Sequence, residues 1–171
     1  MYLLRDAACP SVIYMIYFGL CQSILGYCVS AWGGTYKTTM LKIERAQRAV
    51  LKVMLNRPRM YPTNLVYAES NVLSVRKLYV LKAVLTTHKA VLRSDTYKDL
   101  LRKRVFKIAT PKISTSFAKS HSDYLYPHIY NKVVAKCDIK NHHPFETKKK
   151  IVKWLLPLQY NEVEQLLRTP V

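Results

Sequence analysis

Apolar side chains recur at intervals of three and four residues along most of this chain, a spacing typical of amphipathic helices. The first apolar segment covers residues 12–32 and contains no charged residue. We predict one helix here, with Ser11 as its N-cap and a left-handed turn at Gly33 and Gly34 as its end. Small residues occupy a second stripe, which predicts the close approach of another backbone. The apolar positions are Ile13, Ile16, Tyr17, Leu20, Ile24, Cys28 and Ala31, and the small ones are Gly19, Ser23, Gly26 and Ser30.

A second helix is predicted to begin at Thr38 or Thr39 and to end before Asn56. Glu44 is expected to pair with Arg48 one turn further on, a contact worth about 0.3–0.5 kcal/mol. Four cations aligned along one helix with a single acid nearby favour phosphate contact over an ordinary solvated face. The predicted apolar face comprises Met40, Ile43, Ala46, Val50, Val53 and Met54, and the basic stripe comprises Lys42, Arg45, Arg48 and Lys52.

Prolines and polar residues separate the later helical segments. Pro58 and Pro62 predict an extended turn that exposes Arg57 and Arg59. The fold is therefore predicted to be mainly α, an irregular bundle of about five to seven helices with a basic, loop-rich C-terminal half. We divide it into residues 1–93 and 94–171, which could also form one domain. Further helices are predicted at 63–69, 74–93 with Ser74 as its cap, 95–105, from about 144 onward, and within 159–171, with a loop or weak strands at 107–122.

The charge balance narrows the possible partners. The 171 residues carry 28 Lys and Arg against 10 Asp and Glu, a net charge of +18. Residues 37–153 hold 26 of the basic and 7 of the acidic side chains. Charge of one sign at this density favours a polyanionic partner, either nucleic acid or an anionic membrane surface, and no small-molecule substrate is predicted. A second basic site, in addition to the stripe and the two loop arginines, is predicted at Lys148, Lys149 and Lys150.

Catalytic and metal-binding patterns are missing from the sequence. Adjacent carboxylates that could hold two metal ions do not occur, and all four glycines lie within the first 34 residues, which excludes a later phosphate-binding loop. The four cysteines match no disulfide scaffold and are interpreted as reduced core thiols. Cys137, His142 and His143 are one ligand short of a zinc site. His88 is interpreted as a hydrogen-bonded core histidine, and no enzymatic activity is predicted for this chain alone.

The first two predicted helices carry a resemblance to a known family. The sequence from Tyr17 to Gly34, followed by Leu41-x-Ile43 and Gln47-Arg48, resembles the region after the palm in reverse transcriptases of jockey-like non-LTR retrotransposons. A shorter resemblance continues to about Arg93. The matching positions are Leu20, Ser23, Leu25, Tyr27, Trp32, Gly33, Gln47 and Lys52, and then Thr63, Leu65, Glu69, Val72, Leu73, Leu78 and Tyr79.

This resemblance implies the thumb and post-thumb region of an RNA-directed DNA polymerase, which binds template and primer. The catalytic palm, with its paired aspartates and its magnesium, would precede residue 1, so the chain is expected to be a C-terminal remnant without a cofactor of its own. Its expected partners are RNA, DNA and the rest of a reverse transcriptase, in the nucleus or the cytoplasm.

Two alternatives remain open from the sequence. Residues 12–32 have about the ~20 uncharged residues that a membrane span needs, so the chain could be a small basic membrane protein anchored there, although polar side chains interrupt the segment. The reading frame could also be a fossil without a function. The soluble, nucleic-acid-binding interpretation is preferred.

Overall fold

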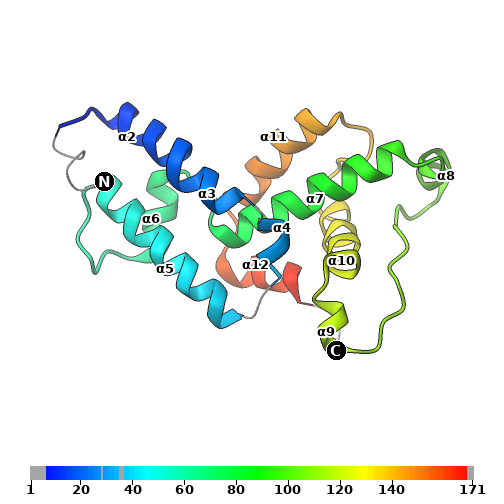
Figure 1. The fold of residues 1–171 in the computed structure, drawn as a ribbon. Helices are drawn as coiled ribbons and strands as arrows, with labels where there is room; N and C mark the ends of the chain where they lie inside the picture. The colour runs from blue at the N-terminus through cyan, green and yellow to red at the C-terminus, as the bar shows by residue number, and fades with distance from the viewer. Residues whose placement is uncertain (1–6, 28, 35–36, 169–171) are drawn as a thin grey trace. The chain divides into compact units, whose positions relative to one another are not determined.

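The computed structural model describes residues 7–27, 29–34 and 37–168, and all regular structure in these ranges is helical (Figure 1). The prediction of a mainly α, irregular helical fold is thus confirmed. The chain forms two compact units, Met1–Leu78 and Tyr79–Val171, and their boundary falls inside one long helix, α7 (Val75–Arg93). The predicted division at residue 93 stays a prediction.

The first unit begins with a continuous helical run that contains a π-helical turn. α2 (Pro10–Ile16) leads into η1 (Tyr17–Gln22) and then α3 (Ser23–Gly26). Tyr27 adopts an extended conformation and ends this run, so the single predicted helix is in fact interrupted. The remaining elements are α4 (Val29–Trp32), α5 (Lys37–Met54), α6 (Thr63–Ser70) and the start of α7.

The π-helical turn changes which residues of this run are buried. Ile13 and Tyr17 are buried as predicted, but Leu20 and Ile24 are 62% and 72% exposed. A π-turn takes up one extra residue, so positions that would follow Tyr17 on the inner face move outward. Cys21 takes the place expected of Leu20 and packs against the core. The predicted apolar face is therefore wrong beyond Tyr17, and Cys28 lies outside the described residues.

Three local predictions for this segment are also wrong. Pro10, whose fixed φ suits the first helical position, starts α2, and Cys9 rather than Ser11 is the N-cap. No atom from outside the local helix lies within 4 Å of a Cβ added at Gly19 or Gly26, so no second backbone packs closely against these glycines. α4 does end before Gly33, but no glycine in the described part of the chain has a positive φ.

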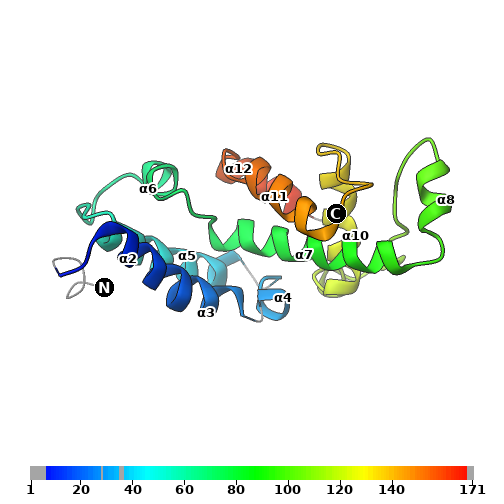
Figure 2. The ribbon, with the colours of Figure 1, turned by 90° about the horizontal axis from the view of Figure 1, so that it is seen from above.

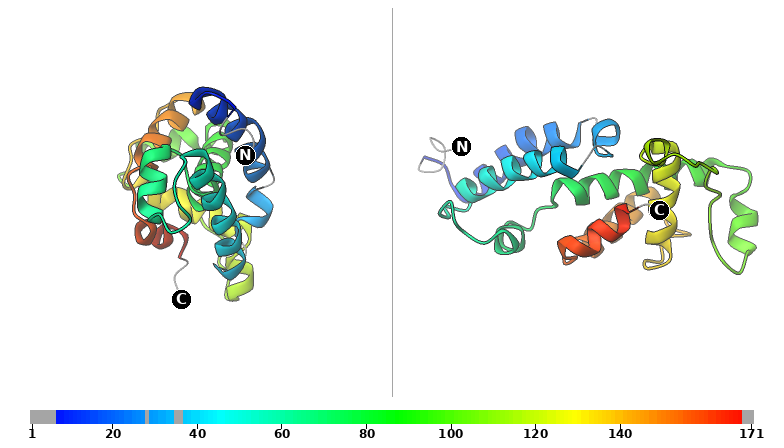
Figure 3. Two further views of the ribbon diagram at one scale, coloured as in Figure 1. Left: turned by 90° about the vertical axis from the view of Figure 1, so that its left-hand side faces the viewer. Right: turned by 90° about the horizontal axis from the view of Figure 1, so that it is seen from below.

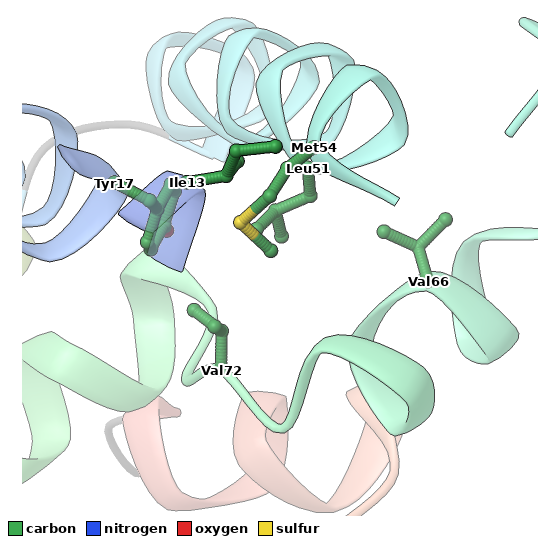
Figure 4. Packing of buried hydrophobic residues seen from close by; sticks show 6 residues of the cluster. All are labelled: Ile13, Tyr17, Leu51, Met54, Val66 and Val72. Carbon is green, nitrogen blue, oxygen red and sulfur yellow. The ribbon is translucent and has the colours of Figure 1, made fainter. Parts of the chain in front are cut away.

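The core of the first unit joins three helical segments that are distant in sequence. Figures 2 and 3 show α2 beside α5, and the two helices contact each other. α6 closes the cluster, and the extended residues before α7 add one more side chain. Figure 4 shows the buried residues Ile13, Tyr17, Leu51, Met54, Val66 and Val72 converging. Burial of each such apolar side chain contributes about 1.5–3 kcal/mol.

In the part of the second unit that the structure describes, residues 79–168, the rest of α7 is followed by five further helices. Predicted and observed bounds agree closely for α7 and for the start of the helix at residue 144, whereas the helix over residues 122–134 was not predicted. Lys77 N donates to Ser74 Oγ at 3.4 Å, as expected of the α7 cap. The helix expected at 95–105 is shorter, and the segment expected to be a loop contains α9. The elements are α8 (Tyr97–Arg102), α9 (Ser116–Lys119), α10 (Ser122–Val134), α11 (Pro144–Leu155) and α12 (Tyr160–Leu167).

His88 is the polar centre of the second unit. It is fully buried, with Nδ1 2.9 Å from Tyr130 Oη and Nε2 2.9 Å from the His142 carbonyl oxygen and 3.1 Å from Thr147 Oγ1. These contacts connect α7, α10 and α11. Burial lowers the pKa of His88, which favours the neutral ring. The interpretation of His88 as a hydrogen-bonded core histidine is confirmed.

Two further sequence expectations concern the thiols and the membrane. Cys9 is exposed, so its interpretation as a core thiol is wrong, whereas Cys21 and Cys137 are half-buried and Cys21 packs against the core of the first unit. Among the described residues, no helix combines the length and the apolar character needed to cross a bilayer.

Candidate nucleic-acid interface

The basic stripe of α5 divides into two outer and two inner cations. Lys42 and Arg45 are exposed, and neither makes an ion pair with a residue that the structure describes. Arg48 and Lys52 are half-buried, at the border between the exposed and buried faces. An α-helix rises 1.5 Å per residue, so the stripe from Lys42 to Lys52 is about 15 Å long.

Glu44, the acid expected on the surface of α5, lies in the interior instead. Its carboxylate accepts a hydrogen bond from Arg76 Nε at 2.9 Å, and the two side chains are only 3% and 4% exposed. The expected pairing with Arg48 stays a prediction, and the ion pair described for Glu44 is the buried one with Arg76 of α7. This burial removes the only acid of α5 from the vicinity of Lys42 and Arg45.

Gln47, which the sequence singled out only through a family resemblance, fixes the orientation of α5. Its Nε2 donates to Tyr17 Oη at 3.0 Å and to the Leu73 carbonyl oxygen at 2.9 Å. Its Oε1 accepts from Tyr67 Oη at 3.0 Å and from Val75 N at 3.1 Å. A carboxamide has two donor hydrogens and one doubly accepting oxygen, so all of its hydrogen-bonding capacity is used. The buried Gln47 thus holds α5 against η1, α6 and the start of α7.

The inner face of α5 accordingly differs from the predicted apolar face. The side chains that it buries are Met40, Glu44, Gln47, Leu51 and Met54, whereas Ile43, Val50 and Val53 are half-buried and Ala46 is exposed. The face is rotated because two polar residues have partners in the interior. This rotation leaves Lys42 and Arg45 directed to solvent.

The two loop arginines have different environments. Arg57 Nε lies 3.0 Å from Glu69 Oε2, and its guanidinium lies 5.1 Å from the centre of the Tyr61 ring. The hydrogen bond from Tyr61 and then that from Arg57 hold the pKa of Glu69 below its ordinary value. Arg59 is exposed and makes no ion pair with any described residue. Arg59 is therefore the arginine of this loop that is available to an external anion.

The lysines of α11 form the predicted basic site of the second unit. Lys148, Lys149 and Lys150 are exposed, because the residues on either side, Thr147 and Ile151, are the buried ones. Lys149 Nζ lies 4.5 Å from the centre of the exposed Phe145 ring. Lys150 is engaged locally, with Nζ 2.7 Å from His142 Nε2 and 3.2 Å from the Asp138 carbonyl oxygen.

Sequence reasoning overlooked the aromatic and apolar side chains that accompany these cations. Phe145 is exposed beside Lys149, and Met60 is exposed beside Arg59. A hydrophobic pattern cannot tell an exposed apolar residue from a buried one, so it gave no signal for either side chain. No group of three His, Cys, Asp or Glu side chains placed to hold a metal ion occurs in the part of the chain that the structure describes.

Comparisons with protein-family models, with curated proteins and with solved structures return no match for this chain. The resemblance to reverse transcriptases, and the predicted nucleic-acid-binding role of the basic residues, therefore stay predictions.

Proposed function

We propose that this chain binds the sugar–phosphate backbone of RNA and DNA through the basic stripe of α5 and the neighbouring Arg59. The observation that carries the proposal is the withdrawal of Glu44 into the interior, which leaves Lys42 and Arg45 exposed without an acidic neighbour on their helix. The two described acids of the first unit, Glu44 and Glu69, are both neutralised by arginines. An anion approaching the stripe therefore meets uncompensated positive charge.

The dimensions of the stripe suit a phosphate backbone. Successive phosphates of one strand in duplex DNA are 3.4 Å apart along the helix axis, so a stripe of about 15 Å faces roughly four of them. Cations on a rigid helix bind phosphates without regard to sequence, since the backbone carries no base information. Binding is accordingly expected to be tolerant of sequence and sensitive to salt. Lys148 and Lys149 form a second site of the same kind on α11.

We further propose that the chain derives from the C-terminal part of a non-LTR retrotransposon reverse transcriptase. The residues that support this origin are those of the sequence resemblance, and two of them, Gln47 and Leu73, are hydrogen-bonded to each other in the core of the first unit. Polymerase activity is assigned to no residue of this chain, because the paired carboxylates that hold the metal ions of that chemistry do not occur in it.

The experiment is a salt titration of binding by fluorescence anisotropy with a 20-nucleotide RNA and a 20-base-pair DNA. Five phosphate contacts predict a slope of log affinity against log salt of about −4.5 for duplex DNA and about −3.5 for the single strand. The double variant K42E/R45E should reduce the magnitude of the duplex slope by about 1.8, since two contacts are lost. Absence of binding at low salt would overturn the proposal.

A matched control separates a specific interface from net charge. The double variant K82E/K89E changes two exposed lysines of α7 and alters the net charge equally. It should retain the wild-type slope; an equal loss would mean that overall charge, and not the stripe, drives binding. The double variant K148E/K149E provides the same measurement for α11.

A further inference from the structure

The turn at residues 58–61 presents an arginine and a methionine side by side at its tip. Tyr61 N donates to the Pro58 carbonyl oxygen at 3.0 Å, which places Arg59 and Met60 at the two central positions. Met60 is 90% exposed, the highest exposed fraction among the large apolar side chains that the structure describes. We call residues 58–61 the Arg-Met turn.

The base of the Arg-Met turn is attached firmly to α5. Lys52 Nζ donates to the Arg59 carbonyl oxygen at 2.6 Å, and Arg57 N donates to the Lys52 carbonyl oxygen at 2.8 Å. Asn56 has a φ of 52°, which turns the chain sharply out of the helix, and Pro58 fixes its own φ. Lys52 belongs to the basic stripe, so the turn continues directly from it.

A second set of contacts holds the far side of the turn. Glu69 on α6 accepts hydrogen bonds from Arg57 Nε and from Tyr61 Oη, and Tyr61 packs against the core cluster of the first unit. The turn is thus attached to both α5 and α6, although its own tip buries nothing. Ordering a turn in this way lowers the entropy lost when the tip engages a partner.

We propose that Met60 is a wedge that inserts between adjacent base pairs of a bound duplex, while Arg59 contacts the flanking phosphate. The inference rests on the proposed function, because the basic stripe supplies the affinity that brings the turn to the duplex. Methionine is unbranched and polarisable, and apolar side chains of this kind are used as wedges by proteins that kink DNA. The bound duplex is bent at the wedge. A base-pair step whose stacking is already disrupted accepts the wedge more readily.

The test compares two 20-base-pair DNAs that differ only in one bulged adenine at the centre. The wild-type chain is expected to bind the bulged duplex about tenfold more tightly, since part of the unstacking cost is already met. M60A should bring this ratio close to one, whereas M60L, which keeps an apolar side chain of similar size, should retain most of it. F117A, which removes another exposed apolar side chain in the second unit, should retain the wild-type ratio.

The outcomes distinguish the wedge from the backbone interface. Salt-sensitive binding of both duplexes with equal affinity by the wild-type chain, or an M60A variant that keeps the wild-type ratio, would overturn the wedge and leave the proposed function standing. Failure to bind either duplex at low salt would overturn both. Energy transfer between dyes at the two DNA ends should report a shorter distance with the wild-type chain than with M60A.

Discussion

Replacement of Gln47 by leucine should destabilise the first unit more than any surface change. Leucine is close to glutamine in size but removes all four hydrogen bonds of the buried carboxamide. The Leu73 carbonyl oxygen and the Val75 N–H belong to the backbone and cannot turn toward water. Each buried polar group left without a partner costs about 1–3 kcal/mol, so these two alone predict a loss of about 2–6 kcal/mol.

The two tyrosines contribute less to this loss than the backbone groups. Burial raises the pKa of both Tyr17 and Tyr67, so each is a neutral hydroxyl at pH 7 and can rotate to reduce its cost. Val75 is the first residue of α7, and its N–H is one of the donors that a helix start leaves without an internal partner. Loss of Gln47 therefore also removes a cap from α7.

The assay uses the two tryptophans of the chain, Trp32 in the first unit and Trp154 in the second. In a W154F background, urea unfolding followed by fluorescence reports on the first unit alone. Domains commonly have a total stability of about 5–15 kcal/mol, so the expected loss is a large fraction of it. Q47L should therefore move the unfolding midpoint to clearly lower urea concentration with little change in the slope of free energy against urea.

The matched control introduces the same side chain on the exposed side of the same helix. A46L should alter the free energy of unfolding by less than about 0.5 kcal/mol, as surface substitutions usually do. A loss of less than about 1 kcal/mol for Q47L, or the same loss for A46L, would refute the assignment of Gln47 as the residue that holds α5 in place.

Two further predictions concern the buried ionisable residues. E44Q should lower the free energy of unfolding of the first unit by about 3–5 kcal/mol in urea, because it leaves Arg76 charged and buried. The double variant E44M/R76M should recover most of that loss, since it removes both charges. A double variant as unstable as E44Q would contradict this view of the pair. In a W32F background, the unfolding free energy reported by Trp154 should be highest above about pH 6.5 and fall below it, because the pKa of His88 is lowered by burial and the unfolded chain takes up the proton first. A single histidine changes the free energy of unfolding by at most about 1.4 kcal/mol per pH unit. H88Q should therefore reduce the slope of this free energy against pH by up to that value between pH 7 and pH 5. An unchanged slope would exclude His88 as its source.

Helix positions were predictable where the signals that set them are local. The N-terminal bounds of α6 and α7 follow from Pro62 and Ser74, and that of α11 follows from Pro144, which begins the helix. Proline and capping residues act on the backbone within one turn, so their effect does not depend on the rest of the fold. The expected and observed helices agree there.

The candidate site was predictable only in part. The exposure of Lys42, Arg45 and Arg59 agrees with the pattern of charged residues, since desolvating an unpaired charge is too costly for it to be buried. The different environment of Arg57 depends on Glu69, twelve residues further on, and so could not be read from the spacing of the basic residues. The exposure of Met60 depends likewise on how the turn is attached to α5 and α6.

By itself, the sequence determined that this protein is helical, strongly basic and divided by prolines, because these properties arise from single residues and their near neighbours. The tertiary structure alone decided that Glu44 and Gln47 point inward and that Leu20 and Ile24 point outward. The first two have partners 32 and 26–30 residues away, at Arg76 and at Leu73, Val75 and Tyr17. The other two are displaced by a π-helical turn that no spacing of apolar residues signals. The open cationic face of α5 results from these long-range contacts, since they remove its acid and set the rotation of the helix.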